Sequence, residues 1–291
     1  MLLALAAIWG ASFLLLKIGA PVLGPITLIE VRVALAAGAL ALFAVLTGRG
    51  VRLRHRWWQY LVLGAVNAAL PFTLIATAEL RLTSGVAAIL NATTPMFTAI
   101  WAWAWQKEPL TPAKVSGVFL GIVGVAVLVG AGAGGQDLWT YAGLSLLAAF
   151  SYGFAGVFAV RHLRGERPLD MAVGQQAGAA LWLVVPALLV HPAGPPGAFV
   201  ALSVLVLAIV CTAAAYLLYF SLIQSVGAVR TLTVTFLVPV FAVLWGALAL
   251  GEGLTLNMLL GLAIILASVA LVAGTTRRRG AEAPRAPAGD A

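Results

Sequence analysis

The stretch TTPMFTAIWAWAWQKEPLT, residues 93–111, returns in altered form as LVPVFAVLWGALALGEGLT, residues 237–255. Aligned without a gap, the two stretches lie 144 residues apart and share residues at equivalent positions. The chain therefore contains one apolar helix and its following turn twice, which indicates an internal repeat. The shared pairs are Pro95 and Pro239, Phe97 and Phe241, Trp101 and Trp245, Glu108 and Glu252, Leu110 and Leu254, and Thr111 and Thr255.

The composition indicates a membrane protein. Hydrophobic residues make up 63% of the 291 positions and charged residues only 9%, whereas soluble domains carry about 25% charged residues. The net charge of +8 could suggest nucleic acid, but the basic residues form short runs between apolar stretches. We therefore expect the lipid bilayer, and no nucleic acid, as a partner. The single cysteine is Cys211 and the three histidines are far apart, so we expect no disulfide, metal site or cofactor.

The apolar segments predict an all-α integral membrane protein with ten transmembrane helices. A bilayer core about 30 Å thick requires about 20 apolar residues in each helix. The last residues, 275–291, are polar and rich in Ala and Pro, and we expect a disordered basic cytoplasmic tail. The predicted spans are 2–20, 25–47, 58–79, 83–105, 112–130, 138–160, 168–190, 199–222, 228–250 and 254–274.

The distribution of basic residues predicts the orientation. If the N-terminus is cytoplasmic, the inner loops and the tail hold 14 of the 17 basic residues. Basic residues are enriched in cytoplasmic loops of membrane proteins. We therefore expect a multi-pass protein of the cytoplasmic (inner) membrane with both termini in the cytoplasm.

The repeat extends over nearly the whole chain. At the same offset Gly117 matches Gly261, and at an offset of 143 Trp9-Gly10 matches Tyr152-Gly153. These matches predict one five-helix repeat over residues 1–130 and a second over 131–274. Because five is an odd number, the second repeat enters the membrane inverted. Inverted repeats give a fold two related conformations, one open to each side, which is what a transporter requires.

The repeat and its turn motif resemble those of a known family. The five-plus-five arrangement and the Pro-x-Phe…Glu-x-Leu-Thr turn at Pro95–Thr111 and Pro239–Thr255 are similar to the drug/metabolite transporter superfamily, and especially to its EamA-type ten-helix exporters. The Trp9-Gly10-x-Ser12-Phe13 opening and Arg32 fit the same pattern. The resemblance covers residues 1–274. It implies a central cavity lined by helices 1, 3, 4, 6, 8 and 9, with helices 5 and 10 away from the substrate path. The substrates that it implies include amino acids, other metabolites and toxic compounds, and the aromatic amino-acid exporters are one comparison.

Polar and aromatic residues on the inner helices are the candidates for substrate binding. The helix over 83–105 carries a polar and aromatic stripe on one face, and the helix over 199–222 carries another. The alternative is ordinary packing between helices with weak hydroxyl hydrogen bonds, each contributing about 0.6 kcal/mol. The predicted substrate-binding residues are Trp9, Ser12, Asn67, Phe72, Asn91, Thr94, Thr98, Trp101, Tyr152, Tyr216, Tyr219 and Thr235.

Three prolines are candidates for kinks or hinges: Pro71, Pro95 and Pro239. Proline inside a helix leaves the carbonyl four residues earlier unpaired, and in lipid that carbonyl needs a new partner. The residues four positions earlier are Asn67, Asn91 and Thr235. They could repair the backbone locally or face a wet cavity at mid-depth.

Four charged residues have candidate roles. Lys17 and Arg32 lie inside predicted spans, and Arg32 is expected within about 5 Å of the outer edge. Each could reach the interface along its aliphatic stem, or form an outer vestibule that attracts a substrate carboxylate. Glu108 and Glu252 follow equivalent helices, and we expect structural turn residues that cap the next helix.

These patterns predict a secondary transporter that exports small organic solutes, with amino acids or related metabolites as the expected substrates. A multidrug or quaternary-cation exporter is the alternative, disfavoured because the acids Glu30 and Glu79 lie near the outer edge. A channel or membrane scaffold is more remote, and an enzyme is disfavoured because the sequence contains neither HExxH nor GxSxG. Small residues at Gly117 and Gly121 favour close helix packing, within the chain or in a homodimer.

Overall fold

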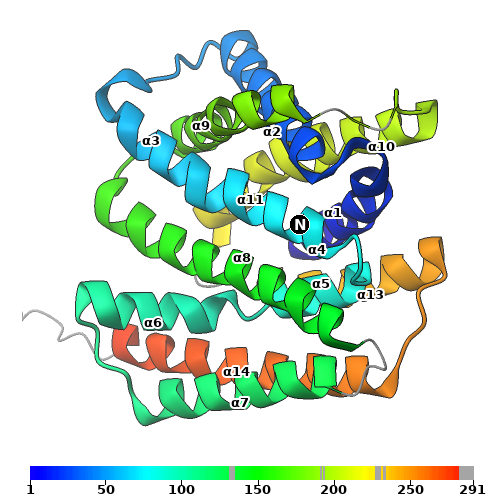
Figure 1. The fold of residues 1–291 in the computed structure, drawn as a ribbon. Helices are drawn as coiled ribbons and strands as arrows, with labels where there is room; N and C mark the ends of the chain where they lie inside the picture. The colour runs from blue at the N-terminus through cyan, green and yellow to red at the C-terminus, as the bar shows by residue number, and fades with distance from the viewer. Residues whose placement is uncertain (131–134, 191, 193, 227–230, 232–233, 282–291) are drawn as a thin grey trace, which may run out of the picture.

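The computed structural model describes residues 1–130, 135–190, 192, 194–226, 231 and 234–281. All regular elements in these ranges are helical (Figure 1). Nine of the described segments are long and apolar enough to cross a membrane, and α13 is a shorter apolar helix. The expected all-α membrane class is confirmed. The elements are α1 Leu2–Leu23, α2 Pro25–Leu46, η1 Arg54–Arg56, α3 Trp57–Gly64, η2 Ala65–Ala69, α4 Leu70–Ala78, α5 Ser84–Asn91, α6 Thr94–Gln106, α7 Pro112–Gly130, α8 Gly135–His162, α9 Pro168–Leu189, α10 Ala198–Ala208, η3 Ile209–Ala214, α11 Ala215–Val226, α13 Val234–Leu250 and α14 Leu256–Ala281.

The helices differ from the predicted spans in four places. The third and eighth spans each contain a π-helical turn, η2 and η3, which begin 144 residues apart at Ala65 and Ile209. The fourth span is interrupted between α5 and α6. The helix α14 continues to Ala281, so it includes residues that the sequence analysis assigned to the tail. Residues 282–291 of that predicted tail lie outside the described residues.

The turn that follows the repeated helix has the same geometry in both halves. Lys107 ends α6 in the left-handed region at φ 59°, and its equivalent Gly251 after α13 has φ 66°. Glu108 then donates its backbone N–H to the Ala102 carbonyl at 3.2 Å. Glu252 forms the equivalent bond with Gly246 at 3.1 Å. Lysine adopts this conformation at a cost that glycine avoids, so the repeat preserves the turn although the residue differs.

Two close helix crossings use equivalent glycines. A side chain at Gly10 of α1 would come within 2.7 Å of Phe241 on α13, and one at Gly153 of α8 within 2.8 Å of Phe97 on α6. Gly10 and Gly153 are the glycines that the sequence paired at an offset of 143. Each crossing joins one helix from residues 1–130 to one from residues 131–274, so neither half packs independently of the other.

A tryptophan hydrogen bond accompanies each of these crossings. Trp245 on α13 donates its indole N–H to the Ala7 carbonyl of α1 at 3.0 Å, and Trp101 on α6 donates to the Phe150 carbonyl of α8 at 3.3 Å. Trp101 and Trp245 form one of the sequence pairs that revealed the repeat. The equivalent tryptophans Trp101 and Trp245 therefore form hydrogen bonds at equivalent helix crossings.

Helices α7 and α14 pack together along one edge of the molecule, seen at the bottom of Figure 1. Ser268 of α14 donates its hydroxyl to the Gly117 carbonyl at 2.7 Å, and Gly261 lies against Leu128. Gly121 lies against Met96 of α6. The small residues that the sequence analysis noted on these helices thus serve packing within the chain.

At one end of the bundle, the loop after α2 is tied to the loop after α8. Glu166 accepts hydrogen bonds from the Tyr60 hydroxyl at 2.9 Å and from the ring of His55 at 3.1 Å, and pairs with Arg56 at 2.8 Å. Burial raises the pKa of Glu166, but the bonds from His55 and Tyr60 and the charge of Arg56 outweigh it and hold the pKa below its usual value. The predicted topology places both loops on one side of the membrane, and this contact agrees with it.

The α6–α8 crossing can be tested with Gly153→Ala, using Gly156→Ala as the control on the same helix. A methyl group at position 153 would meet the backbone of α6, whereas nothing lies within 4 Å of one at position 156. Overpacking costs about 1–3 kcal/mol, while Ala for Gly in an open helix position gains up to about 1 kcal/mol. Gly153→Ala should melt at a lower temperature than wild type in detergent, and Gly156→Ala at an equal or higher one. Equal melting of both variants would refute the close crossing.

Candidate functional site

Arg32 of α2 lies in the interior of the bundle. Only 3% of the surface of Arg32 is exposed to solvent. Its Nε donates a hydrogen bond to the Thr212 hydroxyl at 3.0 Å, and its guanidinium carbon lies 3.9 Å from the centre of the Phe72 ring. Its burial argues against the predicted reach to the membrane interface, while its predicted role in attracting a substrate carboxylate stays a prediction. Counting residues along the second span placed Arg32 near the outer edge of the bilayer core. The sequence did not show that α9, α10 and η3 pack around α2 and bury this residue.

The π-helical turn η3 presents the partner of Arg32. Thr212 is fully buried, and its hydroxyl donates to the Leu207 carbonyl at 2.8 Å while it accepts from Arg32. A π-helical turn disturbs the regular backbone ladder and is frequent at functional sites. Thr212 was not among the predicted binding residues, although it lies one helical turn before the predicted Tyr216. Its hydroxyl joins η3 to α2.

An aromatic cluster adjoins Arg32. Trp9 of α1 contacts Tyr216 and Tyr219 of α11, with ring centroids 6.5 and 5.4 Å apart. Phe72 of α4 contacts Tyr152 of α8 at 6.3 Å, and Arg32 interacts electrostatically with both Tyr152 and Tyr216. Four of the five aromatic residues are half-buried, and Phe72 is buried. The structure therefore brings these predicted residues from four helices to one region.

A chain of amides extends the cluster. Asn67 of η2 donates to the Gln175 side chain at 2.8 Å, and Gln175 in turn is hydrogen-bonded to Tyr216. The adjacent Gln176 is fully buried, and no described residue forms a hydrogen bond with either of its amide atoms. The sequence analysis missed both glutamines. Two consecutive amides in an apolar span, Gln175-Gln176, are the signal that could have revealed them.

The polar stripe on α5 and α6 is used largely for local backbone repair. Thr94 donates its hydroxyl to the Asn91 carbonyl at 2.7 Å, and Thr98 donates to the Thr94 carbonyl at 2.9 Å. The Asn91 side-chain oxygen is buried without a hydrogen-bond partner among the described residues, and the buried Ser12 hydroxyl on α1 lies beside Cys211. Ordinary helix packing with hydroxyl hydrogen bonds is enough to explain Thr94 and Thr98. Asn91 and Ser12 stay candidates for substrate binding. Thr235 is half-buried on α13.

Trp101 packs against α8. Its ring lies 4.9 Å from Phe150 and 5.0 Å from Phe154, and its indole N–H is bonded to the Phe150 carbonyl. Trp105, one turn later, stacks on Phe154 at 5.2 Å. Trp101 thus has a structural contact that does not require a solute.

The three prolines occupy different helical positions. Pro71 and Pro95 lie in the first turns of α4 and α6, where the missing N–H is tolerated, and Pro239 lies inside α13. Pro71 lies two residues after the end of η2, and Pro95 follows the interruption before α6. Where the sequence predicted helix kinks, the structure therefore has a π-helical turn before Pro71 and a break in the helix before Pro95.

Lys17 and Glu252 close the end of the bundle opposite the Glu166 loops. The Lys17 ammonium group donates hydrogen bonds to the Glu79 and Leu82 carbonyls at 2.6 and 2.7 Å. These bonds satisfy backbone carbonyls that follow the end of α4. Lys17 is thus occupied by the backbone and does not stand free in a vestibule. Glu252 accepts from the Ser84 N–H at 2.9 Å and the Ser84 hydroxyl at 2.8 Å.

The two repeated glutamates have different partners. Glu252 caps α5, in the other half of the chain, whereas the sequence analysis expected it to cap the helix that follows it. Glu108 pairs with Lys114 of α7 at 3.4 Å and is half-exposed. The residues equivalent to Ser84 and Gly85 in the second half are 228 and 229, which lie outside the described residues.

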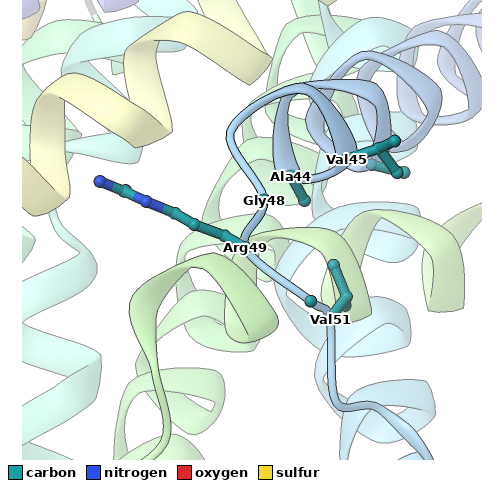
Figure 2. A pocket seen from close by; sticks show the side chains of 7 residues that line it. Ala44, Val45, Gly48, Arg49 and Val51 are labelled. Atoms are coloured by element: carbon teal, nitrogen blue, oxygen red, sulfur yellow. The ribbon is translucent and has the colours of Figure 1, made fainter.

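A surface pocket lies away from these groups, where α2 ends. Figure 2 shows it lined by Ala44, Val45, Gly48, Arg49 and Val51. None of its lining residues belongs to the predicted binding set, and Arg49 is its only charged group. We do not assign it to the solute pathway.

Comparison with known proteins decides the family. Residues 1–130 and 139–274 each match the EamA-like transporter family. The chain belongs to the EamA-like transporter family. Among its relatives are the uncharacterized transporter YvbV of Bacillus subtilis, 26% identical over 92% of this chain and 88% of that one, and the uncharacterized inner membrane transporter YedA of Escherichia coli, 28% identical over 93% and 89%.

Two further similarities concern function and fold. A probable amino-acid metabolite efflux pump of Salmonella typhimurium is 26% identical over 92% of this chain and 91% of that protein. A solved crystal structure aligns with this EamA-like chain at a TM-score of 0.66 and 21% identity, covering 97% of this chain and 98% of the other. That likeness establishes the fold.

Thr212→Val tests the buried contact of Arg32, and Thr77→Val is its control. Valine removes the acceptor of the Arg32 Nε bond, whereas the Thr77 hydroxyl bonds only to the Thr73 carbonyl of its own helix. An unsatisfied buried donor costs about 1–3 kcal/mol. Thr212→Val should therefore lower the melting temperature of the purified protein by about 5 °C, and Thr77→Val by much less. Similar losses in the two variants would count against the Arg32–Thr212 bond.

Proposed function

We propose that this EamA-like transporter exports small organic solutes, with amino acids or related metabolites as substrates, across the cytoplasmic membrane by alternating access. The observation that carries the substrate class is the buried cation Arg32 beside Phe72 and the half-buried aromatic cluster of Trp9, Tyr152 and Tyr216. A guanidinium favours a carboxylate, and aromatic faces favour flat or apolar groups. The relation to a probable amino-acid metabolite efflux pump supports the same class.

The repeated helix crossings support alternating access. The α1–α13 and α6–α8 contacts are built from equivalent residues, at Gly10 and Gly153 and at Trp245 and Trp101. Exchanging the conformations of two related halves around such contacts gives two states, one open to each side. A channel or scaffold has no need of two equivalent interfaces.

The alternative of a quaternary-cation exporter is disfavoured by the charge of the cluster. A cationic solute beside Arg32 would meet a like charge in a medium of low dielectric constant. Glu79 is a buried acid that interacts with Arg32, and its carboxyl oxygens have no hydrogen-bond partner in the part of the chain that the structure describes. A carboxylate-bearing solute suits this arrangement better than a cation.

Counterflow in proteoliposomes tests the proposed substrate class. Vesicles loaded with unlabelled amino acids should accumulate the labelled compounds, and quaternary cations should not exchange. Tyr216→Ala should reduce counterflow about tenfold because it removes a ring contact with Trp9, whereas Trp103→Ala, at a 51% exposed position on α6, should retain it. Exchange of cations alone would favour the alternative, and wild-type flux in both Tyr216→Ala and Trp9→Ala would exclude this cluster from the pathway.

Cysteine labelling tests the proposed orientation. In a Cys211→Ser background, single cysteines at Arg81 and Arg164, both exposed, should react with impermeant reagents from opposite sides of the membrane. Intact cells should label the cysteine at position 81 and leave that at position 164 unlabelled until the membrane is opened. Labelling of both from outside would contradict the ten-span topology, and the reverse pattern would invert it.

A further inference from the structure

Glu79 follows the last residue of α4 and is completely buried. Among the described residues, neither of its carboxyl oxygens has a hydrogen-bond partner, although its backbone carbonyl accepts a bond from Lys17. An ionised carboxylate buried without hydrogen bonds is among the most unfavourable groups that a protein interior can hold, and such groups take up a proton instead. The surroundings of Glu79 therefore suit the neutral acid.

The charged groups around Glu79 come from three elements and are engaged elsewhere. Lys17 of α1 donates to the Glu79 and Leu82 carbonyls, and Arg32 of α2 donates to Thr212. Glu252, in the turn after α13, is a second acid whose charge opposes ionisation of Glu79. The two cations attract a negative charge here, but neither supplies the hydrogen bonds that a buried carboxylate needs.

The position of Glu79 links it to the closure of this end of the bundle. Glu252 and its partners Ser84 and Gly85 form a latch between the turn after α13 and the start of α5. A side chain at Gly246 of α13 would meet both Glu252 and Ser84, so the latch is tightly packed. The latch joins the two halves of the chain, and opening a path at this end requires its parts to separate and water to reach Glu79.

We propose that the Glu79 carboxyl is a proton-binding site that gates this end of the pathway: the end is closed while Glu79 carries a proton and opens when the proton is lost. The proton comes from water as the end closes and returns to water as it opens, so each conformational cycle takes up and releases one proton at this carboxyl. The inference rests on the alternating access proposed above. It makes the proton a ligand of the transporter in addition to the organic solute.

The energetic reason is the difference in hydration between the two states. In the open state water solvates the carboxylate, and ionisation at neutral pH follows from the ordinary behaviour of glutamate. In the closed state the same charge would be buried without hydrogen bonds, so closure favours the protonated form. By linkage, whatever protonates Glu79 also favours closure, and the ratio of closed to open molecules changes by up to about tenfold per pH unit for one proton.

Distance measurements test this gate without any solute. Spin labels at Arg81→Cys and Leu254→Cys, in a Cys211→Ser background, report on the separation of the turn after α4 from the turn after α13. Both positions are exposed. In nanodiscs titrated from about pH 9 to about pH 5, the short-distance population should grow as the pH falls. Glu79→Gln, which mimics the neutral acid, should show the short distance at every pH.

Glu30→Gln is the matched control, because Glu30 on α2 is a second acid with an oxygen that no described residue bonds, but it is only partly buried. It should keep the wild-type pH response. Infrared difference spectra of the unlabelled protein should show a carboxylic-acid C=O band that Glu79→Gln lacks. A pH-independent distance in the wild type would overturn the proposal, and so would a response removed by Glu30→Gln but not by Glu79→Gln. Absence of solute flux with an intact distance response would refute only the proposed transport function.

Discussion

The structure depends on close backbone contact between helices from different halves of the chain. At Gly10 and Gly153 there is no room for a side chain, because α13 and α6 press directly against α1 and α8. In a bilayer the lipid is as apolar as the side chains, so helices associate through such close packing and a few hydrogen bonds. The indole bonds of Trp245 and Trp101 are placed beside these crossings, and the polar residues of the interior are positioned by them.

Much of this architecture was predictable from the sequence because helix length, charge bias and the repeat are local or periodic signals. The Glu166 and Glu252 contacts join loops that the charge distribution had placed on common sides. The interior placement of Arg32 was not predictable, since distance along one helix does not report which neighbours surround it. Gln175 was missed for a similar reason: its role comes from a contact with Asn67, 108 residues earlier.

The repeat is preserved in backbone geometry more faithfully than in side-chain chemistry. The turns at Lys107 and Gly251 share a left-handed residue, and η2 and η3 begin at equivalent positions. The groups they present differ, however, because η2 offers Asn67 to Gln175 while η3 offers Thr212 to Arg32. Because the two backbones are related, the halves can exchange conformations in the proposed transport cycle. Because their side chains differ, only the η3 side of the proposed pathway carries the cation Arg32. Symmetric motion and asymmetric recognition are therefore compatible in one chain.

The buried charges make the two functions of the interior depend on each other. Arg32 lies within electrostatic reach of both Glu79 and the tyrosines of the cluster, so ionisation of Glu79 would supply a competing negative charge for the same cation. Among the described residues, a neutral Glu79 leaves Arg32 with a hydroxyl, an aromatic ring and nearby tyrosines but no anion, which is an incomplete environment for a buried guanidinium. A solute carboxylate would complete that environment. In the proposed gate, the protonation of Glu79 that closes one end of the bundle would thus also favour binding of an anionic group at Arg32.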